Sequence, residues 1–262
     1  MISNSQLKKY TTLKEKKCRD REQCFIVEGV RVCEEALNSN FDIEMCLYHR
    51  QQLTTSRALQ MVDIIKERGL PLEEIDNQAL KKLTDTQHPQ GIVFIVKKQM
   101  LQLSSFIQST AKLFVAIEAI NDPGNLGTIM RTASWFGADG LLLSENSVDY
   151  TNPKVVRASM GAIFHFPIFE NLALRKTLFD LKNQGYDLIL ADANGDIAYS
   201  EIQYSSKTVL ILGGETVSVS DQLKTIVNTS VRIPRAGRGD SLNVSIAAGI
   251  ILSEIVRRKI VE

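Results

Sequence analysis

Three loops of this chain carry polar side chains whose types and order suggest chemistry. The first contains an amide and leads to a guanidinium, the second ends on a carboxylate, and the third holds a hydroxyl and another amide. These side chains are Asn125, Arg131, Glu215, Ser241 and Asn243. Amide, hydroxyl and guanidinium groups hydrogen-bond to phosphate and sugar oxygens, and a guanidinium also stabilises a developing negative charge. The set therefore favours positioning of an oxygen-rich substrate, without a metal ion.

Each loop follows an apolar run that predicts a buried β-strand, and the first and third lead into helical periodicity. The three segments span residues 117–143, 210–220 and 231–256. Their glycines let backbone amides come close to a ligand. One such segment alone is equally well explained by a tight turn or by a capped helix, with Ser241 or Asn243 as the cap. Three in one α/β domain favour a ligand site, because ligands in such sheets bind beyond the carboxyl ends of strands.

The three motifs together resemble the signature of the SpoU (TrmH-like) RNA ribose methyltransferases, a branch of the SPOUT class. They read DPGNLGTIMRTA at 122–133, LGGE at 212–215 and IPRAGRGDSLNVSIAAG at 233–249. The resemblance implies that the mainly parallel sheet of the C-terminal α/β domain is threaded as a deep trefoil knot. Only the resemblance implies the knot, since such threading is a rare exception to the topology rules.

The same resemblance implies transfer of a methyl group from S-adenosylmethionine to a ribose 2′-hydroxyl of RNA. The methyl carbon of this sulfonium is already activated, so the protein needs mainly to align the hydroxyl and to handle one proton. The adenosine part of the cofactor is expected to lie against Leu212, Gly213, Gly214, Ile233 and Leu242.

Arg131 is the residue to which the resemblance gives the central role. A guanidinium holds its proton too strongly to be an ordinary base, which favours stabilisation of the developing alkoxide or a grip on the adjacent phosphate. Family members are commonly assigned an arginine that assists deprotonation, and both roles stay open. Asn125 would orient the arginine or the ribose, and Glu215 would position Asn125 or Arg131. Ser241 and Asn243 would hydrogen-bond the substrate, with helix capping as the alternative.

Two positions depart from the family pattern. Ser218 stands where a glycine usually follows the acidic residue by three positions, and Arg235 stands where methionine usually follows Ile-Pro. Either change could weaken cofactor binding or adapt the site to a particular RNA. An RNA-binding protein of the same fold that has lost catalysis is therefore an alternative, against which the retained polar residues of the three motifs argue.

The N-terminal part of the chain predicts a small α/β sandwich. Strands are expected at 24–27, 43–48 and 92–96, and helices at 30–38, 55–68 and 77–83. FIVEGVRVCEEAL at 25–37 resembles the opening of the ribosomal-protein-like domain that often precedes the SpoU domain. We therefore predict an RNA substrate-binding domain at 1–98, a linker at 99–111 and a SpoU-type methyltransferase domain at 112–262.

The net charge of +1 does not by itself suggest nucleic acid, but its distribution is uneven. Residues 1–21 contain seven Lys or Arg against two acidic residues. Such a segment suits phosphate contact, although a solvated basic helix explains it as well. The residues predicted to contact RNA are Lys8, Lys9, Lys14, Lys16, Lys17, Arg31, Lys154 and Arg157.

Composition limits the other possibilities. A hydrophobic content of 44% with 23% charged residues is ordinary for a soluble protein, and neither a membrane-spanning run nor a signal peptide is evident. The four cysteines form no C-x-x-C pair, which predicts reduced thiols in the cytoplasm and no metal site. No G-x-G-x-x-G follows a strand, which argues against a nicotinamide dehydrogenase.

These observations lead to one functional prediction. The protein is expected to be a cytoplasmic, homodimeric RNA 2′-O-ribose methyltransferase that uses S-adenosylmethionine. Ribosomal RNA is preferred over transfer RNA as the substrate, because a separate N-terminal domain accompanies many ribosomal enzymes. The dimer is expected to form through the helix at 244–256, whose small and apolar residues include Ala247, Ala248, Gly249 and Ile251.

Overall fold

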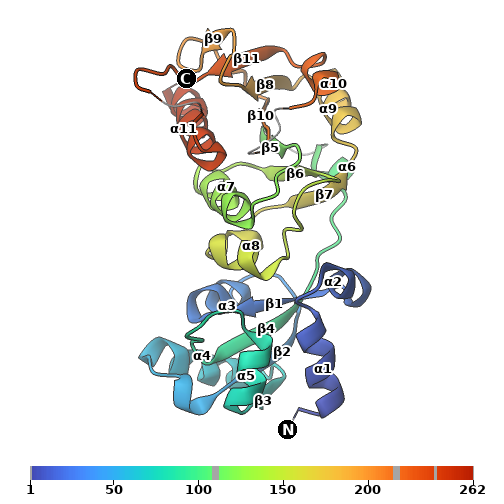
Figure 1. Cartoon of the computed structure of the whole chain (residues 1–262), viewed down its shortest axis with the longest axis vertical. Coiled ribbons are helices and arrows are strands. Elements are labelled where there is room, and N and C mark those ends of the chain that lie inside the picture. The colour runs from blue at the N-terminus through green and yellow to red at the C-terminus, as the bar shows by residue number, and fades with distance from the viewer. Residues whose placement is uncertain (1, 108–111, 215–218, 239–240, 262) are drawn as a thin grey trace. The chain divides into compact units, whose positions relative to one another are not determined.

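A computed structural model describes residues 2–107, 112–214, 219–238 and 241–261 of the chain. The chain divides into two compact units (Figure 1). Unit 1 comprises Met1–Met100 and Thr151–His165, and unit 2 comprises Leu101–Tyr150 and Phe166–Glu262. By its contacts, the segment 151–165 therefore belongs to unit 1, although its sequence lies within the predicted methyltransferase domain. The functional division at residues 98 and 111 stays a prediction.

Unit 1 is built on a four-stranded sheet with strand order β1-β4-β2-β3. The strands are β1 (Cys24–Glu28), β2 (Ile43–Tyr48), β3 (Leu72–Glu74) and β4 (Ile92–Lys97). β4 runs antiparallel to both β1 and β2, and β3 is parallel to β2. β1 is buried along its whole length, as expected for a strand with helices on both faces. The predicted strand at 43–48 is confirmed.

The helices of unit 1 begin where the sequence provides caps. Asp76 accepts a hydrogen bond from the backbone of Ala79, and Thr55 does the same for Ala58, so two helices start at the residues after these caps. The helices are α1 (Asn4–Thr12), α2 (Lys16–Glu22), α3 (Val30–Leu37), η1 (Arg50–Gln52), α4 (Ser56–Glu67), α5 (Asn77–Leu83), α8 (Pro153–Ala158) and η2 (Ala162–Phe164). The predicted helix at 77–83 is confirmed.

The basic segment at the N-terminus is not wholly a surface feature. Arg19 is only 2% exposed, and its guanidinium donates to the carbonyl oxygens of Leu13 at 2.9 Å and Lys14 at 2.8 Å. These bonds hold the turn between α1 and α2, where backbone groups would otherwise lack partners. Arg19 therefore has a structural role that its position in a charged run did not indicate.

Segment 151–165 is tied to unit 1 by charged and steric contacts. The Arg157 guanidinium pairs with Glu28, which is 5% exposed, and His165 Nε2 lies 2.7 Å from Glu35 Oε2. Gly161 has a φ of +98°, and a Cβ at this position would collide with the side chain of Glu35. Glycine is therefore required there, both for the backbone conformation and for the close approach.

Unit 2 is an α/β domain with a seven-stranded sheet of order β7-β6-β5-β10-β8-β11-β9. Every strand pairing in this sheet is parallel. The strands are β5 (Leu113–Ile117), β6 (Gly140–Ser144), β7 (Ile168–Leu172), β8 (Asp187–Ala191), β9 (Ile197–Ala198), β10 (Thr208–Leu212) and β11 (Thr229–Arg232). The predicted mainly parallel α/β fold is confirmed, and the trefoil knot stays a prediction.

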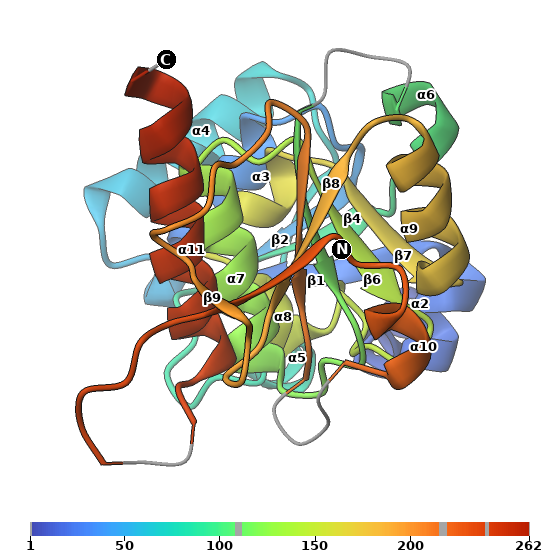
Figure 2. The same cartoon turned by 90° about the horizontal axis from the view of Figure 1, so that it is seen from above.

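Helices cover both faces of this sheet (Figure 2). One face carries α7 (Pro123–Trp135) and α11 (Val244–Val261), and the other carries α6 (Leu103–Ile107), α9 (Leu174–Asn183) and α10 (Asp221–Lys224). α6 lies within the stretch predicted as a linker. It is anchored by Phe106, whose ring centroid is 5.2 Å from that of Phe169. Part of the predicted linker thus packs into the core of unit 2.

The four cysteines, at 18, 24, 33 and 46, are free and buried. Burial, with a hydrogen bond from Sγ to Glu44, raises the pKa of the Cys24 thiol to about 12. Burial also raises the pKa of Cys46 to about 12. Because only thiolates react readily, we expect a chromogenic disulfide reagent to label almost none of the four thiols in native protein at pH 8. All four should react in denaturant, and rapid labelling of Cys24 or Cys46 in the native protein would contradict this expectation.

Among the residues that the structure describes, no helix combines the length and apolar character needed to cross a membrane.

Candidate functional site

The three polar loops follow the carboxyl ends of β5, β10 and β11. β5 and β10 are neighbours in the sheet, and β8 separates β10 from β11. All four strands are parallel, so the loops leave the same edge. The ladder between β5 and β10 continues by one more bond, from Glu118 N to the carbonyl oxygen of Leu212 at 3.0 Å.

Asn125 and Asn243, from the first and third loops, are in direct contact. Asn243 Nδ2 donates to Asn125 Oδ1 at 3.0 Å. Asn243 Oδ1 also accepts from the backbone nitrogen of Ser245 at 2.9 Å, at the start of α11. Asn243 therefore caps α11 and also contacts Asn125. Its hydrogen bond to the substrate stays a prediction. The side-chain amide of Asn243 cannot rotate away without breaking both hydrogen bonds. The first turns of α7 and α11 are therefore fixed relative to each other.

Arg131 is not part of this contact. It lies six positions after Asn125 on α7, which places it about 9 Å further along the axis and about 120° around the helix. Its side chain is exposed, and it forms no hydrogen bond or ion pair with any residue that the structure describes. Trp135, one turn further along, is 85% exposed. This face of α7 therefore exposes a guanidinium and a large aromatic ring.

The second loop begins with a close approach between two strand ends. Leu212 is 1% exposed, and Gly213 and Gly214 are half-buried. A Cβ at Gly214 would collide with the carbonyl oxygen of Ala119, so packing alone already demands glycine there. Glu215 and Ser218, to which the sequence assigned an acidic role and a departure from the family, lie outside the described residues.

The third loop leaves apolar surface uncovered beside polar groups. Leu242 is 48% exposed and Ile233 is half-buried. Ser241 and Arg235 are exposed. Aliphatic side chains of this kind suit a purine base, which needs flat apolar contact and a few hydrogen bonds. The contact of Ile233 and Leu242 with the adenosine part of S-adenosylmethionine stays a prediction, and Arg235 brings a cation to the same loop.

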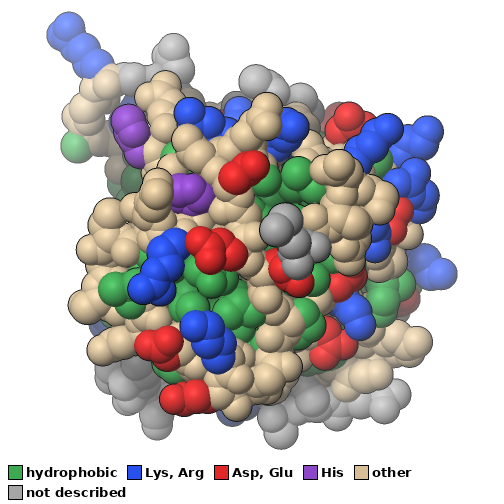
Figure 3. All heavy atoms as spheres, turned by 90° about the horizontal axis from the view of Figure 1, so that it is seen from below, with side chains coloured by type: hydrophobic (Ala, Val, Ile, Leu, Met, Phe, Trp, Pro, Cys, Tyr) green, Lys and Arg blue, Asp and Glu red, His purple; other side chains and the backbone are tan. Residues whose placement is uncertain are grey.

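The residues predicted to contact RNA fall into two groups. Lys9 lies 3.3 Å from Glu22 and 3.4 Å from Glu44, Lys14 lies 2.9 Å from Asp85, and Arg157 pairs with Glu28. The exposed group, which forms no ion pair within the described residues, is Lys8, Lys16, Lys17, Arg31 and Lys154. Figure 3 shows a face on which Lys and Arg side chains alternate with carboxylates around a hydrophobic area. The free cations are thus the better candidates for phosphate contact.

Sequence reasoning missed one residue at the edge of the sheet that carries the three loops. Glu118 directly follows β5, and its two carboxylate oxygens accept from Ser220 N at 2.7 Å and Ser220 Oγ at 2.8 Å. A carboxylate placed just past the carboxyl end of a buried strand was the available signal, since that is where ligand sites form in such sheets.

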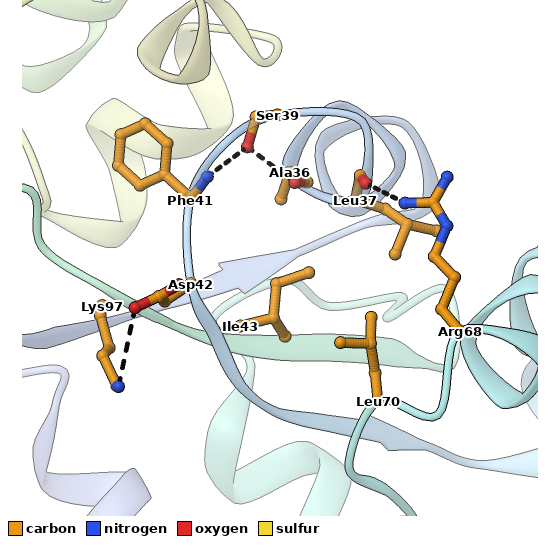
Figure 4. Close-up of a pocket in the computed structure, with 9 residues that line it drawn as sticks. All are labelled: Ala36, Leu37, Ser39, Phe41, Asp42, Ile43, Arg68, Leu70 and Lys97. Carbon is orange, nitrogen blue, oxygen red and sulfur yellow. Dashed lines mark hydrogen bonds and ion pairs between the residues drawn. The ribbon is translucent and has the colours of Figure 1, made fainter.

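A pocket of about 410 Å³ lies in unit 1 (Figure 4). Arg68 reaches across it and donates to the carbonyl oxygen of Leu37 at 2.5 Å, and Lys97 lies 3.8 Å from Asp42. The lining consists of Ala36, Leu37, Ser39, Phe41, Asp42, Ile43, Arg68, Leu70 and Lys97. None of these residues belongs to the predicted site. Elsewhere in the described ranges, no three His, Cys, Asp or Glu side chains gather as a metal site would require.

Two family models match the chain. The SpoU rRNA Methylase family matches residues 112–253, and the MRM3-like substrate binding domain matches residues 4–93. A curated relative is the 23S rRNA (guanosine(2553)-2′-O)-methyltransferase RlmP of Bacillus subtilis, 30% identical over 249 residues that cover 95% of each chain.

Two solved structures are similar over nearly the whole chain. The SpoU methyltransferase AviRb from Streptomyces viridochromogenes, in complex with the cofactor AdoMet, has a TM-score of 0.86 at 27% identity, covering 98% of this chain and 99% of that one. The AdoMet-bound rRNA methyltransferase from Sinorhizobium meliloti has a TM-score of 0.85 at 30% identity, covering 100% and 97%.

Proposed function

Because this chain belongs to the SpoU rRNA methylase family, we propose that it transfers a methyl group from S-adenosylmethionine to a ribose 2′-hydroxyl of ribosomal RNA. The observation that carries the proposal is the bond between Asn125 and Asn243, which joins the first and third motifs at the edge where ligands of parallel sheets bind. The relative RlmP acts on 23S rRNA, which supports ribosomal over transfer RNA.

The cofactor, when bound, supplies an activated methyl group. Leu212, Gly213 and Gly214 would hold its adenosine part through backbone contacts. Ile233 and Leu242 would flank the base, because both leave aliphatic surface uncovered beside the loop. The exposed guanidinium of Arg235 would lie near this end of the site, where other family members place methionine.

The polar residues act on the ribose. The amide pair of Asn125 and Asn243 would orient the sugar, and Ser241 would hydrogen-bond the adjoining phosphate or ribose. Arg131 would stabilise the oxygen as its proton leaves, because a fixed cation lowers the free energy of an alkoxide in a site that excludes water. We assign the acidic position to Glu215 from the sequence motif.

A homodimer completes this arrangement. The interface predicted from the sequence is wrong at two positions, because Ala248 and Ile251 are 0% and 1% exposed and pack inside unit 2. Two large apolar side chains on α7 and α11 are exposed instead. They are Trp135 on α7, which is 85% exposed, and Ile246 on α11, which is 52% exposed. An isologous contact through them would bring the Arg131 of one subunit toward the amide pair of the other.

Unit 1 would bind the RNA. Its residues 4–93 match a substrate binding domain, and five exposed lysines and arginines of the unit form no ion pair in the described part of the chain. Phosphate contacts of this kind give affinity and register but carry little sequence information. The nucleotide to be methylated would then be selected by the loops of unit 2.

The proposal is tested by mapping 2′-O-methyl groups in ribosomal RNA from cells with and without the gene. One ribosomal nucleotide should lose its methyl group in the deletion strain, and purified protein with S-adenosylmethionine should restore it in vitro. Loss of a methyl group from transfer RNA instead would identify transfer RNA as the substrate. An unchanged map, with no heat of cofactor binding even for Arg235→Met, would indicate the RNA-binding protein without catalysis.

A further inference from the structure

We propose that Glu118 and Ala119, directly after β5, are positioning residues that fix the two described flanks of the second loop and thereby set the affinity for S-adenosylmethionine. The flanks are Gly213–Gly214 and Val219–Ser220, on either side of the acidic position. The inference rests on the proposed function, since it concerns the same cofactor site. It assigns to Glu118 an effect on the cofactor without contact to it.

The first flank is held by backbone contacts. Glu118 N donates to Leu212 at 3.0 Å, and Gly214 packs directly on the carbonyl group of Ala119. Ala119 itself has a φ of +57°, a conformation that L-residues other than Asn and Asp rarely adopt. Its N–H donates to Ser144 Oγ at 2.9 Å, which helps to hold it there. Strain of this kind persists where the surroundings fix it, and it concentrates at binding sites.

The second flank is held by two hydrogen bonds between the carboxylate of Glu118 and Ser220. Glu118 Oε2 accepts from Ser220 N at 2.7 Å, and Oε1 accepts from Ser220 Oγ at 2.8 Å. Two bonds from one carboxylate to one residue fix direction as well as distance. The neighbouring Val219 is 5% exposed and packs into the core of unit 2. The flank is therefore anchored on both sides of its backbone.

The location of these bonds favours a role in binding over a role in stability. Ser220 is exposed, and polar contacts at the surface contribute little to folding, because water replaces them at small cost. The bonds fix the backbone of the two described flanks of the second loop. A loop already held in its bound conformation loses less entropy when a ligand binds, so the gain appears as affinity.

The test compares Glu118→Ala, Glu118→Gln and Ser220→Ala by calorimetry with S-adenosylmethionine and by methyl transfer to ribosomal RNA. Glu118→Ala should raise Kd and the KM for the cofactor about tenfold, with kcat at saturating cofactor within about twofold of wild type. Ser220→Ala should raise Kd about threefold, and the double alanine variant should be no weaker than Glu118→Ala alone. Glu118→Gln should recover most of the loss, because its amide oxygen still accepts from Ser220 N.

Glu201→Gln, an exposed glutamate elsewhere in unit 2, is the matched control and should leave Kd unchanged. Melting temperatures of all variants should agree within about 2 °C. An unchanged Kd in Glu118→Ala overturns the inference. A large loss in Glu118→Ala with none in Ser220→Ala also overturns it, and would place the carboxylate on the cofactor itself. Wild-type protein that binds no cofactor would instead refute the proposed function.

Discussion

Replacing Arg131 by alanine is expected to lower methyl transfer about a hundred- to a thousandfold while the affinity for S-adenosylmethionine changes about twofold or less. The guanidinium is exposed and forms no bond with the described residues, so its removal leaves none of those residues without a partner. Arg131→Lys keeps the charge and loses the planar fork, and it should recover only part of the rate. Measured kcat and calorimetric Kd would separate the two effects.

The same variant tests whether the site is shared between subunits. Arg131→Ala and Asn243→Ala homodimers should both be inactive. In an isolated mixed dimer, a shared site would keep both residues intact at one of two places and give about half of the wild-type activity. A site within one subunit would leave the mixed dimer inactive. In that case the dimer proposed through Trp135 and Ile246 would have no catalytic role.

The second large effect is expected on stability. Arg157→Ala should lower the free energy of unfolding by about 3 kcal/mol, because it leaves the carboxylate of Glu28 buried without its cation. Glu28 is 5% exposed, and its remaining donors among the described residues are neutral, such as the backbone nitrogen of Asp85 at 3.2 Å. A double variant, Glu28→Gln with Arg157→Ala, should regain a large part of the loss. Urea titrations of the three proteins give the required free energies.

Lys154→Ala on the same helix is the matched control. Its side chain is exposed and unpaired among the described residues, so the variant should unfold like wild type. If Lys154 contacts a phosphate, the variant should bind RNA more weakly. The slope of the logarithm of the RNA-binding constant against the logarithm of salt concentration should then become smaller in magnitude by about one. The result that would contradict this prediction is an Arg157→Ala protein that has wild-type stability but binds RNA more weakly. Arg157 would then contact RNA, as the sequence predicts, and would not be needed for stability.

The alternation of strands and helices could be predicted well because local patterns decide it. The strand at 43–48 and the helix at 77–83 have the predicted bounds, since apolar spacing and the cap at Asp76 act within a few residues. The family was identified correctly from three motifs, as the match over residues 112–253 shows. That Asn125 meets Asn243 was suggested only in outline, by the rule that loops share one edge of a parallel sheet.

Features that depend on contacts between residues far apart in the chain could not be predicted from the sequence. Arg19 looks like its neighbours in a basic run, yet it is buried because its guanidinium completes a turn. Ala248 and Ile251 have the pattern of an interface, but both are buried within unit 2, where α11 packs on α7, and no local signal separates the two cases. The position of Glu118 just past a buried strand is its one sequence signal, and its contact with Ser220, more than a hundred residues later, becomes visible only in the structure.

The assignment of residues 151–165 to unit 1 has a consequence for synthesis on the ribosome. The nascent chain has made the four-stranded sheet by residue 97, but it must still add β5, α7 and β6 before α8 appears. At usual elongation rates this delay is roughly 3 to 13 s. During it, Phe25 lacks the ring of Phe164, which stacks on it at 6.3 Å in the finished protein. Unit 1 therefore completes its aromatic packing only after part of unit 2 has been synthesised.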